Sequence, residues 1–252
     1  MDWIKITIMK TILFLVGTRP EFIKIYSVLK KLKEERKFKI ILVSSNQQNR
    51  ILNKYINDFK IDHNLKINNY NSDSDFLSKL FTGLNKYLKK KKLHYILVQG
   101  DTTTAYGGAL FGFLNQIPVI HLEAGLRTHD LKSPWPEEFY RQNISSMASI
   151  HLSQTSTSKK NLFSENIKRN IHIVGNPGID YFFEKISLIK ENYNLKKKHK
   201  EIIITMHRRE SINSNLQKFI DNLIIFSNKK KNYKFIWPVH SNENVQKIIN
   251  GE

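Results

Sequence analysis

Short apolar runs alternate along this chain with segments in which apolar residues recur at the spacing of an α-helix. The runs are continuous rather than alternating, which is typical of strands buried on both faces of a parallel sheet. We expect strands at Ile12–Val16, Phe38–Ser44, Tyr95–Val98, Ile117–His121, Ile150–Ser153, Ile171–Val174, Ile202–Thr205 and Phe235–Val239. We expect helices at Glu21–Glu35, Arg50–Asp58, Asp75–Lys90, Thr103–Leu114, Glu137–Ala148, Thr157–Phe163, Asp180–Lys190 and Leu216–Ser227. Because no hairpin signal interrupts this order, the pattern predicts an α/β protein built from βαβ units.

The strongest turn cluster, Gly175-Asn-Pro-Gly178, separates a longer set of strand–helix repeats from a shorter one. We therefore predict a Rossmann-like N-terminal domain over residues 1–175 and a partial C-terminal domain over residues 176–252. A chain of 252 residues with 40% hydrophobic content can bury one full core and begin another.

Composition narrows the class of protein. The chain has no cysteine, which excludes a disulfide framework and a thiolate metal site and suits a reducing cytoplasm. The net charge of +19 suggests nucleic acid as a partner, but the lysines fall in surface-like runs without interleaved aromatic residues. We therefore expect solvated loops and no nucleic-acid partner.

The apolar run from Thr11 to Gly17 is too short for a membrane span and lacks a signal cleavage site. We therefore expect a buried first strand and no membrane association.

Candidate chemistry lies just after the predicted strands, because ligands of doubly wound sheets bind outside the carboxyl ends of the strands. Arg19 follows the first strand at the start of a helix, where an anion is favoured. Asp101, Glu123 and Glu137 follow later strands and are expected on one rim, where neighbouring charges can separate acid and base roles. Structural alternatives remain for each of them. Asp101 would then be a helix N-cap, Glu123 would pair with Arg127, and Glu137 would favour a helix N-terminus.

Basic residues follow the strands of the second part. His207 and Arg208 come after one predicted strand and His240 after the next, a combination that suits a diphosphate. None of the histidines has the spacing of a zinc motif, so no metal is expected.

Taken together, the motifs resemble those of the non-hydrolysing UDP-N-acetylglucosamine 2-epimerase family. The motifs are Gly17-Thr-Arg-Pro-Glu21, Gln99-Gly-Asp-Thr-Thr-Thr104, His121-Leu-Glu-Ala-Gly-Leu-Arg127, Ser133-Pro-Trp-Pro-Glu-Glu138, Val174-Gly-Asn-Pro-Gly-Ile-Asp180 and His207-Arg-Arg-Glu-Ser211. The resemblance implies two Rossmann-like domains of the glycosyltransferase-B type facing a cleft. It also implies interconversion of UDP-N-acetylglucosamine and UDP-N-acetylmannosamine by elimination and re-addition of UDP, without a nicotinamide or other cofactor.

The same resemblance assigns roles residue by residue. Asp101, Glu123 and Glu137 match the acid–base candidates, and His207 matches the histidine near the departing diphosphate. Arg19 and Lys24 are expected to line the cleft. Together with Arg127, Arg208 and His240, whose chemistry suits a diphosphate or other anionic group, they are our expected substrate-binding positions. Gln47 lies in a loop that departs from the Gln-His pair of the family, so a contribution of this loop to an activator-nucleotide site stays open.

A second departure concerns length, since the Ser-Gly-Gly and Gln-Glu-Glu segment that holds UDP in family members is absent. We therefore expect a fragment with impaired activity, completed by a companion chain or forming a homodimer when complete. The alternatives are a hydrolysing 2-epimerase or related glycosyltransferase-B-type enzyme, and a non-catalytic remnant that binds nucleotide sugars.

Overall fold

The computed structural model describes residues 9–48, 59–189, 200–205, 209–230 and 232–238. The chain divides into two compact units, Met1–Ile189 and Lys190–Glu252. The strands of the first unit are β1 Lys10–Val16, β2 Phe38–Ser44, β3 His63–Asn64, β4 Tyr95–Gln99, β5 Val119–Leu122, β6 Ile150–Ser153 and β7 Ile171–Ile173. Its helices are α1 Arg19–Glu35, α3 Asp73–Leu88, α4 Thr103–Leu114, α5 Glu137–Met147, α6 Ser156–Ser164 and α7 Pro177–Ile189.

The strands of the first unit form one parallel sheet in the order β3-β2-β1-β4-β5-β6-β7. The chain moves outward from β1 to β3, returns to place β4 on the other side of β1, and then continues through β7. The order therefore reverses between β1 and β4, and doubly wound sheets bind their ligands at the carboxyl ends of the strands beside such a reversal. The α/β class with parallel strands, predicted from the apolar runs, is confirmed.

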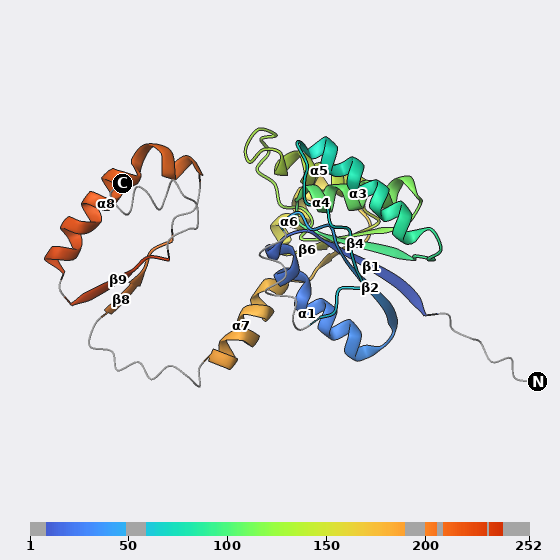
Figure 1. Ribbon diagram of the computed structural model, residues 1–252, viewed down its shortest axis with the longest axis horizontal. Coiled ribbons are helices and arrows are strands. Elements are labelled where there is room, and N and C mark those ends of the chain that lie inside the picture. Colours follow the sequence, from blue (N-terminus) through green and yellow to red (C-terminus); the bar gives the residue numbers. More distant parts are fainter. Residues whose placement is uncertain (1–8, 49–58, 190–199, 206–208, 231, 239–252) are drawn as a thin grey trace, which may run out of the picture. The chain divides into compact units, whose positions relative to one another are not determined.

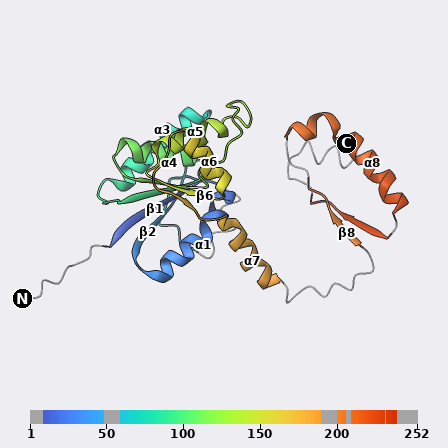
Figure 2. The same cartoon turned by 180° about the vertical axis from the view of Figure 1, so that it is seen from behind.

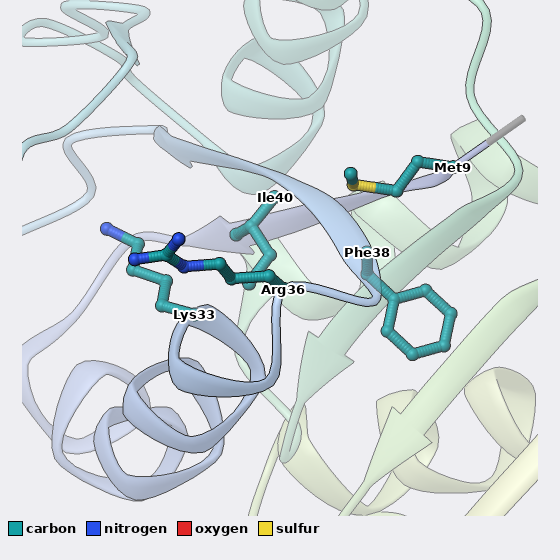
Figure 3. Close-up of a pocket in the computed structure, with 5 residues that line it drawn as sticks. All are labelled: Met9, Lys33, Arg36, Phe38 and Ile40. Atoms are coloured by element: carbon teal, nitrogen blue, oxygen red, sulfur yellow. The ribbon is translucent and has the colours of Figure 1, made fainter.

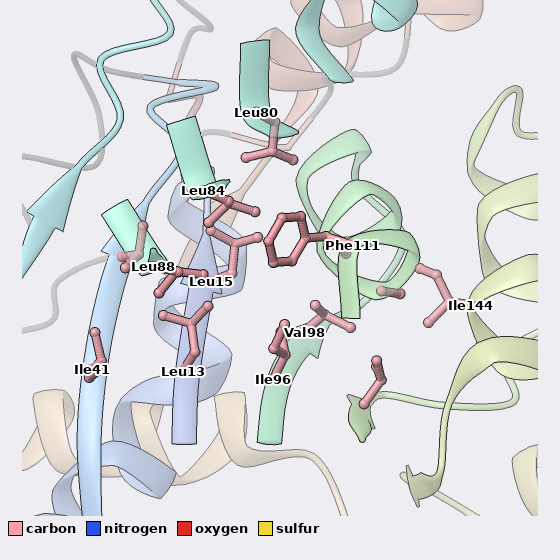
Figure 4. Packing of buried hydrophobic residues seen from close by; sticks show 14 of the residues in the cluster. Leu13, Leu15, Ile41, Leu80, Leu84, Leu88, Ile96, Val98, Phe111 and Ile144 are labelled. Carbon is pink, nitrogen blue, oxygen red and sulfur yellow. The ribbon is translucent and has the colours of Figure 1, made fainter. Parts of the chain in front are cut away.

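Helices cover both faces of this sheet (Figures 1 and 2), and an apolar core lies on each face. Leu13 and Leu15 of β1 face α3, α4 and α5, as Figure 4 shows, whereas Phe14 and Val16 of the same strand pack towards α1. Successive side chains of a strand point to opposite faces, so a strand between two helical layers is apolar throughout. This is the physical reason for the continuous apolar runs in the sequence.

Most predicted elements are found within a few residues of their expected bounds, and β2, β6 and α4 have the predicted bounds. The two-residue strand β3 was not predicted, because two residues are too few for a periodic signal. The predicted helix Arg50–Asp58 lies outside the described residues.

The first compact unit extends to Ile189, beyond the expected boundary at residue 175, because α7 packs against α1. The hydroxyl of Tyr26 donates to Glu184 at 3.3 Å, and Tyr26 and Tyr181 meet edge to face. The turn at Gly175 therefore precedes a helix that belongs to the first unit.

The second unit contains β8 Lys200–Ile203, α8 Arg209–Lys229 and β9 Tyr233–Ile236. β8 and β9 pair in parallel, so the unit is a single βαβ motif among the described residues. In the part of the chain that the structure describes, we find no helix with the length and apolar character needed to cross a membrane.

Candidate active site

The predicted rim forms where β1, β2, β4 and β5 end. Arg19 follows β1, Gln47 follows β2, Asp101 follows β4 and Glu123 follows β5. These strands are parallel neighbours, so their carboxyl ends bring the four residues to the same edge of the sheet.

Glu123 is held by two partners from other elements. Its Oε2 accepts hydrogen bonds from Nζ of Lys24, on α1, and from Nε2 of Gln99, the last residue of β4. The Glu123 side chain is only 10% exposed, so the ion pair with Lys24 is largely shielded from water. The alternative pairing of Glu123 with Arg127 is therefore not formed.

Glu123 itself and the neighbouring Gly100 both have a left-handed backbone conformation. Glu123 has φ 74° and Gly100, at the end of the neighbouring strand, has φ 70°. A positive φ is uncommon for glutamate and costs conformational free energy, a feature that clusters at functional sites. A Cβ on Gly100 would lie 3.5 Å from Oε2 of Glu123, so the glycine leaves room beside the carboxylate.

Asp101 is paired with an arginine that sequence reasoning missed. Nη2 of Arg141, on α5, lies 2.5 Å from Oδ2 of Asp101, and Nη1 of Arg141 lies 3.1 Å from Oε2 of Glu138. Arg141 stands four residues after Glu137, a spacing that places both on one face of α5. That spacing was the available signal for Arg141.

Glu138 is the second carboxylate that binds Arg141. Its side chain is fully buried and accepts hydrogen bonds from the backbone N–H groups of Thr128 and His129 and from Gln142. Burial acts to raise the pKa of Glu138, but the hydrogen bonds outweigh it and lower the pKa below its usual range. Glu138 therefore stays ionised, and its charge fixes Arg141.

Glu137 is the first residue of α5, and its Oε2 is buried without a hydrogen-bond partner among the described residues. A buried carboxyl oxygen with no donor is costly unless the group is protonated or a ligand supplies the partner. The ion pair of Asp101 with Arg141 brings the helix that begins with Glu137 to the Asp101 turn.

Gln47 contacts the start of α4. Its Oε1 accepts hydrogen bonds from the backbone N–H of Thr104 at 3.2 Å and from the Thr104 hydroxyl at 2.7 Å. These contacts satisfy donors at the N-terminus of α4. A role for Gln47 in binding an activator stays a prediction.

His121 is a further residue that sequence reasoning did not assign to the site. It lies on β5, two residues before Glu123, and its Nε2–H donates to the carbonyl of Gly100 at 2.9 Å. Burial lowers its pKa to about 3, so the ring is neutral. His121 thereby holds the turn that leads to Asp101.

Arg127 occupies a different environment from the one expected. Its side chain is fully buried, and its Nε and Nη2 lie 2.6 Å and 2.7 Å from the two carboxylate oxygens of Glu165. Nη2 also donates to the hydroxyl of Ser145 on α5. This pairing ties the β5–α5 loop to the end of α6, and it gives the predicted substrate contact no support.

Three expected site residues, His207, Arg208 and His240, lie outside the described residues. A pocket of about 330 Å³, lined by Met9, Lys33, Arg36, Phe38 and Ile40, lies at the opposite edge of the sheet, where β1 and β2 begin (Figure 3). Among the described residues, the polar cluster at the carboxyl ends is therefore the stronger candidate for chemistry.

Comparison with known proteins gives a consistent result. Residues 30–252 match the family model described as UDP-N-acetylglucosamine 2-epimerase. The chain is 36% identical over 258 residues to the UDP-N-acetylglucosamine 2-epimerase of Campylobacter jejuni, covering 95% of this chain and 67% of the relative. It is 34% identical over 254 residues to the enzyme of Escherichia coli K12, covering 95% and 68%.

Solved structures agree with these sequence matches. The crystal structure of UDP-GlcNAc 2-epimerase from Neisseria meningitidis, bound to UDP-GlcNAc, superposes with a TM-score of 0.86 at 32% identity. The match covers 96% of this chain and 69% of that one. The Rossmann-like architecture of the glycosyltransferase-B type is thus confirmed, and the chain spans about two thirds of the length of its relatives.

Proposed function

Since the chain belongs to the UDP-N-acetylglucosamine 2-epimerase family, we propose that it interconverts UDP-N-acetylglucosamine and UDP-N-acetylmannosamine without net hydrolysis. The observation that carries this proposal is the pair of carboxylates at the carboxyl ends of β4 and β5, each with its own cationic partner. Asp101 is paired with Arg141 and Glu123 with Lys24.

The proposed reaction has two balanced halves. A base removes the proton from C2 of the sugar, the C1–O bond breaks, and UDP leaves with the bonding electrons to give 2-acetamidoglucal. An acid then delivers a proton to the opposite face of C2, and the UDP oxygen re-forms its bond to C1. Such a reaction requires proton-transfer groups on both faces of the sugar ring and positive charge near the departing diphosphate.

The site contains groups suited to these requirements. Asp101, Glu123 and Glu137 are proposed to exchange protons with the sugar. Oε2 of Glu137, which has no hydrogen-bond partner within the described part of the chain, can bind a substrate hydroxyl or hold a proton. Arg19, in the first turn of α1, is proposed to stabilise the negative charge of UDP with the help of the helix N-terminus. Single substitutions of the three carboxylates distinguish the acid from the base.

The direct assay incubates UDP-N-acetylglucosamine in deuterated buffer with a fusion that joins this chain to the remaining part of the Campylobacter jejuni relative. Formation of UDP-N-acetylmannosamine with deuterium at C2 supports the proposal, whereas free N-acetylmannosamine and UDP indicate a hydrolysing enzyme. Binding without deuterium incorporation indicates a non-catalytic nucleotide-sugar protein. Asp101→Asn or Glu123→Gln should slow turnover about a hundredfold or more, while Glu34→Gln, on an exposed residue of α1, is the matched control.

We further propose that residues 1–252 alone turn over slowly, because the relatives are longer and precise positioning supplies much of catalysis. The comparison is with the same fusion. Equal turnover by the chain and the fusion would contradict this part of the proposal. The expected homodimer and companion chain stay predictions.

A further inference from the structure

Glu21 is a buried carboxylate whose hydrogen bonds exceed what its helix needs. It is the third residue of α1 and forms a capping box with Thr18, the N-cap. Its side chain lies in the interior, and the residue is 1% exposed. A capping box satisfies the first turn of its own helix and does not require a buried carboxylate.

The two oxygens of Glu21 reach two different turns. Oε2 accepts the backbone N–H groups of Gly17 and Thr18 at 2.9 Å and 2.7 Å. Oε1 accepts the hydroxyl of Thr102, which belongs to the turn after β4, at 2.7 Å. The turn after β1 leads into Arg19, and the turn after β4 contains Asp101. β1 and β4 are adjacent in the sheet.

Thr102 extends this connection into α4. Its hydroxyl oxygen is the N-cap of α4 and accepts the backbone N–H of Ala105 at 3.0 Å. The hydroxyl proton is directed to Glu21, so one side chain links the first turns of both helices. The hydrogen bonds therefore run from the Gly17 and Thr18 amides through Glu21 and Thr102 to Ala105.

The start of α3 provides a comparison within the molecule. Asp75 occupies the same third position after the N-cap Ser72, but its carboxylate accepts the Asn71 N–H and pairs with Lys79 of the same helix. Among the described residues, the Asp75 carboxylate makes no hydrogen bond to another strand. Burial raises the pKa of Glu21 although Thr102, Gly17 and Thr18 stabilise its ionised form, so the interior position carries a cost that α3 avoids.

We propose that Glu21 is a positioning residue for the proposed epimerase reaction, because it holds the turn bearing Arg19 against the turn bearing Asp101 through Thr102. Arg19 and Asp101 reach the substrate from different strands, so their relative placement depends on a contact between those strands' turns. A small misplacement of such groups is costly for catalysis.

Amide hydrogen exchange on the full 252-residue chain tests the connection without any activity. Thr102→Val removes the hydroxyl while preserving the shape of the side chain. Because coupling between sites is reciprocal, we expect exchange at Gly17 and Thr18 to accelerate at least about threefold. Thr155→Val removes the same kind of N-cap from α6 and should leave both amides unchanged. Unaltered exchange at Gly17 and Thr18 in Thr102→Val would overturn the proposal.

Turnover of UDP-N-acetylglucosamine, measured in the fusion described above, tests the role in catalysis. The amide of Glu21→Gln can still accept the Gly17 and Thr18 N–H groups and donate to Thr102, so we expect kcat within about threefold of the unaltered fusion. Glu21→Ala and Thr102→Val should each lower kcat at least about tenfold, and the double variant should be no worse than the poorer single variant.

The outcomes separate the possibilities. Equal losses in Glu21→Gln and Glu21→Ala would show that Glu21 acts through its charge or proton rather than by positioning, and additive losses in the double variant would show that Glu21 and Thr102 act independently. Either result overturns the inference. An unaltered fusion that fails to convert the substrate would instead refute the proposed function, while the amide exchange result would still decide the connection between the turns.

Discussion

Because His121 beside the site is buried and neutral, we predict that the free energy of unfolding decreases in acid. His121 is 1% exposed, and its Nε2–H donates to the carbonyl of Gly100 at 2.9 Å. Its Nδ1 is buried without a partner among the described residues, so a second proton there would have no acceptor. Burial holds the pKa of His121 at about 3 in the folded chain.

The magnitude follows from proton linkage. An unfolded histidine has a pKa of about 6.5, so between about pH 6.5 and pH 3 the unfolded chain binds one more proton at this position. The unfolded state then gains free energy as the pH falls. The free energy of unfolding should therefore decrease by about 1.4 kcal/mol for each pH unit below about 6, from this residue alone. Burial also lowers the pKa of His151, the neighbour of His121 on β6, and this adds a contribution of the same sign.

The assay is urea unfolding followed by circular dichroism at several values between pH 4.5 and pH 6.5. Because a glutamine amide can donate to Gly100 but does not titrate, His121→Gln should reduce the slope of stability against pH by about one proton. His172→Gln, at an exposed position on β7, is the matched control. Equal slopes for His121→Gln and the unaltered chain would refute the reasoning.

Two further predictions concern stability around the site. Arg127→Met should lower the free energy of unfolding by about 2 kcal/mol, because it removes a buried guanidinium and leaves the carboxylate of Glu165 without that partner. A change below about 0.5 kcal/mol in urea unfolding would contradict this. Gly100→Ala and Gly175→Ala should each cost about 1–2 kcal/mol, since both glycines have positive φ. Only Gly100→Ala should slow deuterium incorporation at C2 by the fusion, because only there would the added Cβ approach Glu123. Equal incorporation by both glycine variants would contradict the placement of Glu123 in the site.

The sequence by itself determined the layered α/β fold and the edge of the sheet at which polar groups gather. Apolar runs with no alternation require cover on both faces, and parallel strands bring the residues that follow them to one edge. For this reason Arg19, Asp101 and Glu123 could be assigned to one rim from their positions alone.

Only the tertiary structure decided which side chains meet at that rim. Lys24 pairs with Glu123 and Arg141 with Asp101, across 99 and 40 residues of sequence respectively. Local pattern describes neighbours within a few residues, whereas these pairs depend on how α1 and α5 pack against the sheet. Arg127 shows the same limit, since a motif position beside Glu123 did not reveal that Glu165, on the end of another helix, would hold its guanidinium.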